Sequence, residues 1–410
     1  MICISVKILS FYPGIRQLAH KEVIVSLGKH LVFVGGGHAH MTSLKNLGYF
    51  TSRGHRVTLI SASPYHYYSG MGPGMLSGIY HPREVRFHVK KLAEDRGAAF
   101  INARAVRVDT HKRLLFLDSG EEVHYDVVSF NTGSDVPTGL LTGTPDEHLF
   151  PVKPVIHLLK ARQAILKAIR DDKILRFTIV GGGPAGVEIS ANLLRLLREN
   201  RGKGEITLIA AKNLLDGAPD KARRLAVESL AQRGVRIVEG RHVKAIEKRI
   251  VHFNDGEQIP TDFAFIAIGI RPSGLFRASG LPTGADGGLL VNACLQSVAH
   301  PDMFGGGDCI SLEGRPLAKV GVYAVRENPV LFQNLAAALD RGAMKAFTPQ
   351  SHFLLIFNMG NGRGIYWKRN WVCEGRIAFL LKDYLDRSFM KTFQVSGERD
   401  EKSDIPNEEL

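Results

Sequence analysis

Short apolar runs that end in glycine-rich turns are the clearest pattern along the chain. Residues 31–34 and 177–180 are bulky or β-branched apolar segments, typical of strands inside a parallel sheet. The turns that follow read GGGHAH at 35–40 and GGGPAG at 181–186. Apolar positions at helical spacing come after the second turn. The pattern therefore predicts two strand–turn–helix units of an α/β protein.

Both turns have the form of a dinucleotide site. In such a turn the first glycine permits the tight bend and the second lets the backbone approach a pyrophosphate, which the next helix faces with its N-terminus. Gly35 and Gly37, and again Gly181 and Gly183, hold these positions. The third glycine is present in the second turn, whereas His40 replaces it in the first. Two such turns predict two dinucleotides bound at once. The alternative is a pair of ordinary strand–turn–helix glycines.

A third motif lies late in the chain, where DMFGGGD at 302–308 is a short apolar strand end followed by small residues and an acid. Two more apolar runs, 127–133 and 265–272, reach a glycine where a chain would cross between nucleotide domains. In this order the segments resemble the two-domain pyridine-nucleotide flavoproteins. That resemblance implies that Asp308 bonds the ribityl hydroxyls of FAD.

We therefore predict two Rossmann-like dinucleotide-binding domains, for FAD and NAD(P)H, with the FAD domain split in sequence and a small C-terminal α+β segment. The expected divisions are an extension at 1–29, the FAD domain at 30–150 and 269–345, the NAD(P) domain at 151–268, a C-terminal interface segment at 346–396 and a disordered polar tail at 397–410.

Composition narrows the function. The formal net charge of +13 favours anionic partners such as phosphorylated cofactors, membranes or nucleic acid. We expect no nucleic acid and no metal, because no zinc-ligand spacing or aromatic RNA-binding motif is visible. No apolar run reaches the 18 residues of a membrane-spanning helix.

The four cysteines argue against a disulfide reductase. Cys3, Cys294, Cys309 and Cys373 contain no C-x-x-C pair, and a dithiol relay needs two neighbouring thiols. Cys309 follows Asp308, so it lies near the cofactor or is a small buried hydrophobe, which we favour.

Two strand ends bear on the ribose contacts. The strand at 56–60 ends at Ser61, where an acid normally holds the adenosine ribose. The strand at 205–209 ends in Ala210, Ala211 and Lys212. An acid there would pair with the 2′-hydroxyl of NADH, and a base with the phosphate of NADPH. Lys212 alone does not decide which nucleotide is bound, so NADH and NADPH both remain candidate cofactors.

A closer resemblance covers about 30–395. The segments 34–40, 63–71, 319–326 and 381–390 resemble one branch of the type II NADH dehydrogenase-like flavoproteins, the branch associated with selenide water dikinase. The resemblance implies FAD, oxidation of NAD(P)H and a quinone-like acceptor. It also implies hydride transfer from the nicotinamide to the flavin.

The same resemblance implies roles for individual residues. Glu188 is expected near the flavin–nicotinamide contact as an orienting or proton-relay group, or else is only an acid favoured by the helix dipole. Lys319 is expected beside the isoalloxazine ring, or is an ordinary surface lysine. The expected cofactor-binding residues are Gly35, Gly37, His38, Ala39, Ser61, Tyr68, Ser69, Thr132, Gly133, Gly181, Gly183, Pro184, Ala185, Gly186, Gly269, Gly307, Asp308, Gly321 and Val322.

Apolar residues from 377 to 393 recur at helical spacing, with Lys382, Arg387 and Lys391 among the remaining positions, so we predict an amphipathic helix. Type II NADH dehydrogenases use such helices to lie on the membrane and reach quinone. One helix can equally cap its own domain or build a dimer, and we rank both above membrane docking.

The leading hypothesis is an FAD-dependent NAD(P)H dehydrogenase that passes electrons to a quinone-like acceptor without a cysteine pair. One alternative is a flavoprotein accessory or redox partner linked to selenium metabolism. A sulfide:quinone-type oxidoreductase is the other, disfavoured by the absent thiol pair. We expect a monomer or homodimer, either in the cytoplasm or peripheral on the cytoplasmic face of the inner membrane.

Overall fold

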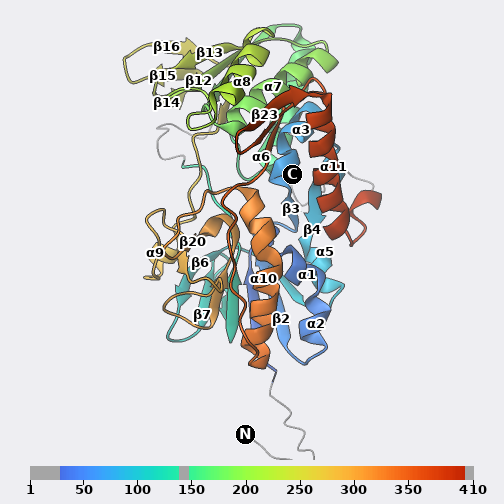
Figure 1. Cartoon of the computed structure of the whole chain (residues 1–410), viewed down its shortest axis with the longest axis vertical. Helices are drawn as coiled ribbons and strands as arrows, with labels where there is room; N and C mark the ends of the chain where they lie inside the picture. Colours follow the sequence, from blue (N-terminus) through green and yellow to red (C-terminus); the bar gives the residue numbers. More distant parts are fainter. Residues whose placement is uncertain (1–27, 138–146, 402–410) are drawn as a thin grey trace, which may run out of the picture.

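Two parallel sheets form the core of the chain. The computed structural model describes residues 28–137 and 147–401 (Figure 1). The first sheet has the order β19 (Met303–Gly305), β9 (Val127–Phe130), β1 (His30–Val34), β2 (Arg56–Ser61) and β5 (Ala99–Asn102). The second has the order β10 (Leu149–Pro151), β17 (Phe263–Ile266), β11 (Ile174–Val180), β12 (Lys203–Ala210) and β13 (Arg236–Glu239). The predicted α/β fold class is confirmed.

The two apolar runs that precede the glycine turns are central strands. β1 lies between β9 and β2, and β11 lies between β17 and β12. All five residues of β1 are buried. A strand in the middle of a covered parallel sheet meets apolar neighbours on both faces, which explains its unbroken apolar sequence.

The helices of the first domain are short except for α10, whereas three of the four in the second domain have at least 12 residues. In the first domain they are η1 (His38–His40), α1 (Met41–Lys45), α2 (Leu47–Thr51), η2 (Ser69–Met71), α3 (Gly72–Ser77), α4 (Pro82–Val85), α5 (Val89–Glu94), α9 (Leu275–Ala278), η5 (Gly307–Cys309) and α10 (Gly321–Asp340). In the second they are α6 (Ile156–Ala168), η4 (Ile169–Asp171), α7 (Pro184–Glu199) and α8 (Asp220–Ala231).

Smaller sheets carry the remaining strands. They are the hairpin of β3 (Tyr65–Tyr67) and β4 (Arg86–His88), then β6 (Ala105–Asp109), β7 (Leu114–Leu117) and β8 (Glu122–His124), then β14 (Val243–Glu247), β15 (Ile250–Phe253) and β16 (Gln258–Pro260), and the pair β18 (Leu289–Val291) and β20 (Ile310–Leu312). Residues 118–121 join β7 to β8.

The first domain is split in sequence. β19 pairs with β9 although the whole second domain lies between them in the chain. The strand β10 already belongs to the second sheet, so that sheet begins at Leu149, just before the expected division at 151. Most of the extension expected at 1–29 lies outside the described residues.

The C-terminal segment connects the two domains. It consists of β21 (Leu355–Asn358), β22 (Gly364–Lys368) and β23 (Trp371–Gly375), followed by α11 (Arg376–Phe393) and η6 (Glu398–Asp400). The strands contact α7 and α8 of the second domain, and α11 reaches α1 of the first. In Figure 1 α11 runs beside α3, along the side of the molecule.

The helix α11 exists as predicted, but its faces are reversed over most of its length. Lys382 and Asp386 are buried, whereas Ile377 and Tyr384 are 83% and 69% exposed. The expectation that these apolar residues cap the chain's own domain is therefore wrong. Only the apolar residues near the end of the helix, such as Phe393, turn inward. None of the helices in the described part of the chain is both long and apolar enough to span a bilayer.

Candidate functional site

The first glycine turn is shaped by contacts that exclude side chains. Gly35 has a φ of +89°, and a Cβ there would lie 2.3 Å from the carbonyl oxygen of Asn131. A Cβ on Gly37 would lie 2.2 Å from Oδ1 of the same asparagine. Both positions therefore require glycine.

Asn131 joins the first turn to the late motif, and sequence reasoning did not identify it as a site residue. Its Oδ1 accepts a hydrogen bond from the backbone N of Ala39 at 3.0 Å. Its Nδ2 donates to the carbonyl of Gly306 at 2.5 Å. The sequence feature that points to Asn131 is its position at the end of a buried strand, beside Thr132 and Gly133. The amide holds two segments that are far apart in sequence in one arrangement.

Asp308 lies at this junction, as expected, with two partners that sequence reasoning also missed. Its Oδ2 accepts hydrogen bonds from Nζ of Lys153 at 2.6 Å and Oγ of Ser134 at 2.8 Å. Next to Asp308, Oε2 of Glu327 accepts a hydrogen bond from the backbone N of Gly307 at 2.5 Å. Burial raises the pKa of Glu327 to about 7, although this hydrogen bond acts in the opposite direction.

His38 provides a test of whether these residues fit a cofactor. Its Nε2 is buried, with no hydrogen-bond partner among residues 28–137 and 147–401. Burial, followed by the charge of Lys153, lowers the pKa of His38 to about 3, so the ring is neutral. A buried polar atom of this kind needs a partner. Together with the glycine turn and Asp308, it fits the pyrophosphate and ribityl groups of FAD.

The second turn repeats the first turn's geometry. Gly181 has a φ of +128°, and a Cβ on Gly186 would lie 1.9 Å from the carbonyl of Gly181. The helix α7 begins at Pro184, whose missing N–H costs nothing in the first helical turn. Ala185 follows it in the helix. Gly183, the residue before α7, has open space around its Cβ position, which leaves room for a dinucleotide.

A cluster of charged side chains joins α7, α11 and the loop before η2. Nζ of Lys382 donates to Oδ2 of Asp386 at 2.8 Å and to the carbonyl of Gly70 at 2.7 Å. The hydroxyl of Tyr68 donates to Oδ1 of Asp386 at 3.0 Å. Oε1 of Glu188 accepts from the backbone N of Asn358 at 2.8 Å.

The charges in this cluster shift one another's protonation. Burial raises the pKa of Glu188, and Asp386 adds to this, while Lys382 opposes it. Burial lowers the pKa of Lys382, but Asp386 and Glu188 outweigh it, so the pKa lies above its ordinary value. The cluster therefore keeps a charged lysine beside a carboxyl group that favours its protonated form.

Other predicted residues lie apart from Glu188. Nζ of Lys319 pairs with Asp286 at 2.8 Å and also donates to the carbonyl of Ile310. Lys319 lines a cleft that includes Gly307, Asp308 and Glu327. The ammonium group of Lys319 already has the carboxylate of Asp286 as a partner. The position of Lys319 beside the flavin ring stays a prediction.

The remaining predicted positions fall at the ends of strands and helices. Ser61 is the last residue of β2, Gly269 follows β17, and Gly321 and Val322 begin α10. A Cβ on Gly321 would lie 3.9 Å from Oγ of Ser69, so these two segments meet. Their roles toward a cofactor remain predictions.

The described cysteines are free. Cys309 is fully buried, and burial raises the pKa of its thiol to about 11. Its Sγ donates to the carbonyls of Phe130 and Gly306 at 3.4 and 3.3 Å. This supports the interpretation of Cys309 as a small buried side chain.

Comparison with known proteins identifies the family. The profile described as pyridine nucleotide-disulphide oxidoreductase matches residues 29–334. The chain belongs to this family. It is an oxidoreductase with FAD and a pyridine nucleotide as cofactors, as the paired glycine turns predicted.

Two curated relatives are similar over most of the chain. Ferroptosis suppressor protein 1 of Taeniopygia guttata is 28% identical over 318 residues, covering 74% of this chain and 80% of the relative. Demethylphylloquinone reductase NdbB of Synechocystis is 28% identical over 297 residues, covering 70% and 72%.

Solved structures share the fold. NDH2 from Plasmodium falciparum in complex with NADH has a TM-score of 0.76 at 14% identity and covers 92% of this chain and 100% of its own. The sulfide:quinone oxidoreductase from Aquifex aeolicus has a TM-score of 0.74 at 19% identity, covering 90% and 92%.

Proposed function

We propose that the chain is an FAD-dependent NAD(P)H:quinone oxidoreductase. The observation that carries this proposal is the cluster at Glu188, where the helix after the second glycine turn meets α11 and the Tyr68 loop of the first domain. Relatives named as a demethylphylloquinone reductase and as NAD(P)H-ubiquinone oxidoreductases support the acceptor class.

The reaction combines NAD(P)H, a quinone and one proton to form NAD(P)⁺ and the quinol. When bound, FAD supplies the two-electron chemistry, because its ring accepts a hydride from a nicotinamide and passes the electrons on. The first glycine turn, Asp308 and His38 would hold it, and the second turn would hold the nucleotide.

The protein's own contribution lies in position and in the proton. Burial raises the pKa of Glu188 above its ordinary value, which favours the protonated form of its carboxyl group, so we assign it the role of proton donor. Lys382 stays charged beside it and orients the carboxyl of Asp386, which in turn fixes the hydroxyl of Tyr68. These groups supply and replace the proton that the quinol requires.

We further propose that the exposed face of α11 lies on a lipid bilayer. Ile377, Leu380 and Tyr384 are 83%, 62% and 69% exposed and lie on one face of α11 by their helical spacing, and Trp371 on β23 is 78% exposed. The opposite, buried side carries Lys382, so only the width of α11 would separate a quinone dissolved in lipid from the cluster. The net charge of +13 favours an anionic surface.

Vesicle binding tests this surface. Leu380→Asp should abolish co-sedimentation with anionic phospholipid vesicles, whereas Val106→Asp, an exposed apolar position on β6, should leave it unchanged. Equal binding of both variants, or a dimer that dissociates in Leu380→Asp while vesicle binding is absent in the wild type, would contradict a membrane role.

The proposed reaction has a direct test. Purified holoprotein is mixed without oxygen with NADH or NADPH, and the visible absorbance of the flavin is followed. We expect rapid bleaching, then recovery when a soluble quinone is added. Failure to bleach with either nucleotide would overturn the proposal and favour a flavin-binding accessory role. The link to selenide water dikinase stays a prediction.

A further inference from the structure

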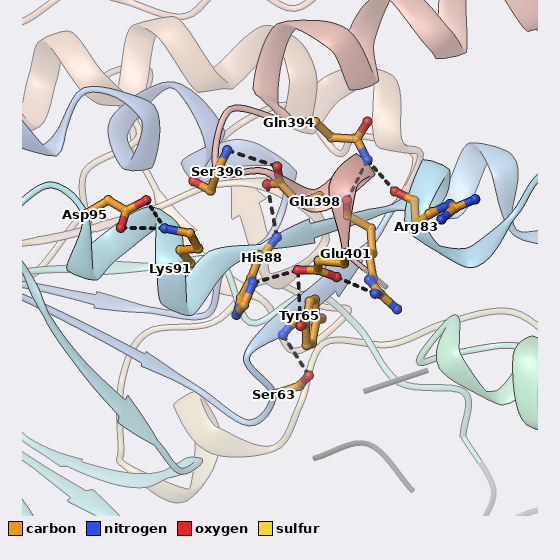
Figure 2. A network of polar contacts seen from close by, with 11 residues as sticks. Ser63, Tyr65, Arg83, His88, Lys91, Asp95, Gln394, Ser396, Glu398 and Glu401 are labelled. Atoms are coloured by element: carbon orange, nitrogen blue, oxygen red, sulfur yellow. Dashed lines mark hydrogen bonds and ion pairs between the residues drawn. The ribbon is translucent and has the colours of Figure 1, made fainter. Parts of the chain in front are cut away.

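The chain after α11 folds back onto the first domain, where a disordered tail was expected from residue 397. Figure 2 shows the segment 394–401, here called the C-terminal clasp, against the β3–β4 hairpin. Glu401 lies at its end. Its Oε1 accepts hydrogen bonds from the hydroxyl of Tyr65 at 3.3 Å and from Nδ1 of His88 at 2.9 Å. Its Oε2 accepts one from Nη2 of Arg86.

A second glutamate of the clasp binds the backbone of the hairpin. Glu398 is only 1% exposed, and its Oε1 accepts from the backbone N of His88 at 3.2 Å. Its Oε2 accepts from the backbone N of Ser396 at 3.0 Å, which shapes the clasp itself. Nε2 of Gln394 donates to the carbonyls of Arg83 and Arg86 at 2.8 and 2.9 Å. Gln394 and Glu398 thus hold the clasp against this hairpin, so the expectation of a disordered tail is wrong for residues 397–401.

The hairpin in turn lies against the first glycine turn. Nε2 of His66 on β3 is 3.4 Å from Nδ1 of His38. Val89, the residue after His88, lies so close that a Cβ on Gly36 would be 3.0 Å from its Cγ1. The backbone group that Glu398 binds and the side chain that abuts the turn therefore belong to consecutive residues, His88 and Val89.

We propose that the C-terminal clasp is a retention device for FAD, with Glu398 and Glu401 as positioning residues that hold the hairpin against the first glycine turn. The clasp acts through His88, Val89 and His66 on the segment that faces the dinucleotide. The proposal rests on FAD binding at this turn and is independent of the electron acceptor.

The coupling must be reciprocal. If the closed clasp tightens the binding of FAD, then bound FAD must stabilise the closed clasp by the same free energy. Arg86, which has no exposed surface, favours closure because its charge is paired by Glu401 in the clasp.

The first measurement is the rate at which the holoprotein releases FAD after dilution, followed by the fluorescence of free FAD. Glu398→Gln and Glu401→Gln should release FAD at least about tenfold faster than the wild type, which at an unchanged association rate is about 1.4 kcal/mol of binding. Tyr65→Phe, which removes one hydrogen bond to Glu401, should have a smaller effect in the same direction. Because it retains every charge, it tests the proposal even if a glutamine variant fails to fold.

Asp95→Asn is the matched control. Asp95 forms an exposed ion pair with Lys91 on α5, at 2.7 Å, close to the clasp but not in contact with it (Figure 2). This variant should release FAD at the wild-type rate. Accelerated release in the control equal to that in Glu401→Gln would show general loosening of the domain and overturn the proposal.

The second measurement detects reciprocity, which a purely structural contact would not show. Trypsin cleaves after Arg399 in η6, and saturation with FAD should slow this cleavage in the wild type. Cleavage unaffected by FAD, or variants that retain FAD as long as the wild type, would each contradict the proposal. Neither measurement uses NAD(P)H or quinone, so failure of the proposed reaction is distinguishable from failure of this inference.

Discussion

Lys382 and Asp386 of α11 form a buried ion pair, with Nζ 2.8 Å from Oδ2, on the side of the helix opposite its exposed apolar residues. Their side chains are 11% and 9% exposed. The pair links the helix to Gly70 and Tyr68 of the first domain and places it beside Glu188 of the second. The helix thereby joins both domains at the proposed reaction centre.

Replacing one residue of this ion pair should lower the free energy of unfolding more than replacing both. Lys382→Met leaves the carboxylate of Asp386 buried without its counter-charge and should reduce the free energy of unfolding by about 3–5 kcal/mol. The double variant Lys382→Met/Asp386→Leu should recover much of this loss, because two apolar side chains pack without charge. Urea denaturation of both proteins measures the difference. Equal stability of single and double variants would show that the pair is not energetically coupled.

Glu188 should be needed for turnover but not for FAD binding. Glu188→Gln retains an acceptor for the backbone N of Asn358 but cannot donate a carboxyl proton, so kcat should fall by about 100-fold, within the range of general acid catalysis. The FAD content should be unchanged. Glu199→Gln, at the exposed end of the same helix α7, serves as the control and should keep full activity. Unaltered turnover in Glu188→Gln would exclude the proton role.

Glu327 should make the protein less stable as the pH rises. Its pKa is about 7 in the folded protein against 4.5 as the ordinary value, so the unfolded chain loses the proton first. The free energy of unfolding therefore falls between about pH 4.5 and 7 and is constant above, by about 3 kcal/mol in total. Glu327→Gln removes this penalty, so it should gain stability at pH 8 and none at pH 4. Denaturation at the two pH values tests this, and an equal change at both would contradict it.

Lys212 should select between the two nucleotides. It follows β12, where Ala211 stands in place of a ribose-binding acid, and it is 80% exposed with Asp216 at 3.6 Å. Lys212→Glu should lower kcat/KM for NADPH by about tenfold, or about 1.4 kcal/mol, and leave NADH nearly unchanged. Lys203→Glu, at the opposite end of the same strand, is the control and should alter neither value. A parallel loss for both nucleotides would remove Lys212 from 2′-phosphate recognition.

The features that the sequence predicted correctly have local causes. The two strand–turn–helix units depend on side-chain periodicity and on glycines at Gly35 and Gly181, whose positive φ angles exclude other residues. Asp308 stands out because its neighbours form a motif along the chain, and its role toward the flavin stays a prediction. These signals lie within a few residues of one another, so no knowledge of distant contacts is required.

The partners of these residues were decided by the tertiary structure. Lys153 reaches Asp308, Asn131 reaches Gly306, and Glu401 reaches the β3–β4 hairpin, each across a long stretch of chain. Periodicity cannot show which face of α11 is buried when an internal ion pair replaces apolar packing, as with Lys382 and Asp386. The sequence by itself determined where each nucleotide turn lies, because local stereochemistry sets it. Only the folded chain decided which charges meet, because burial and pairing depend on segments that come together after folding.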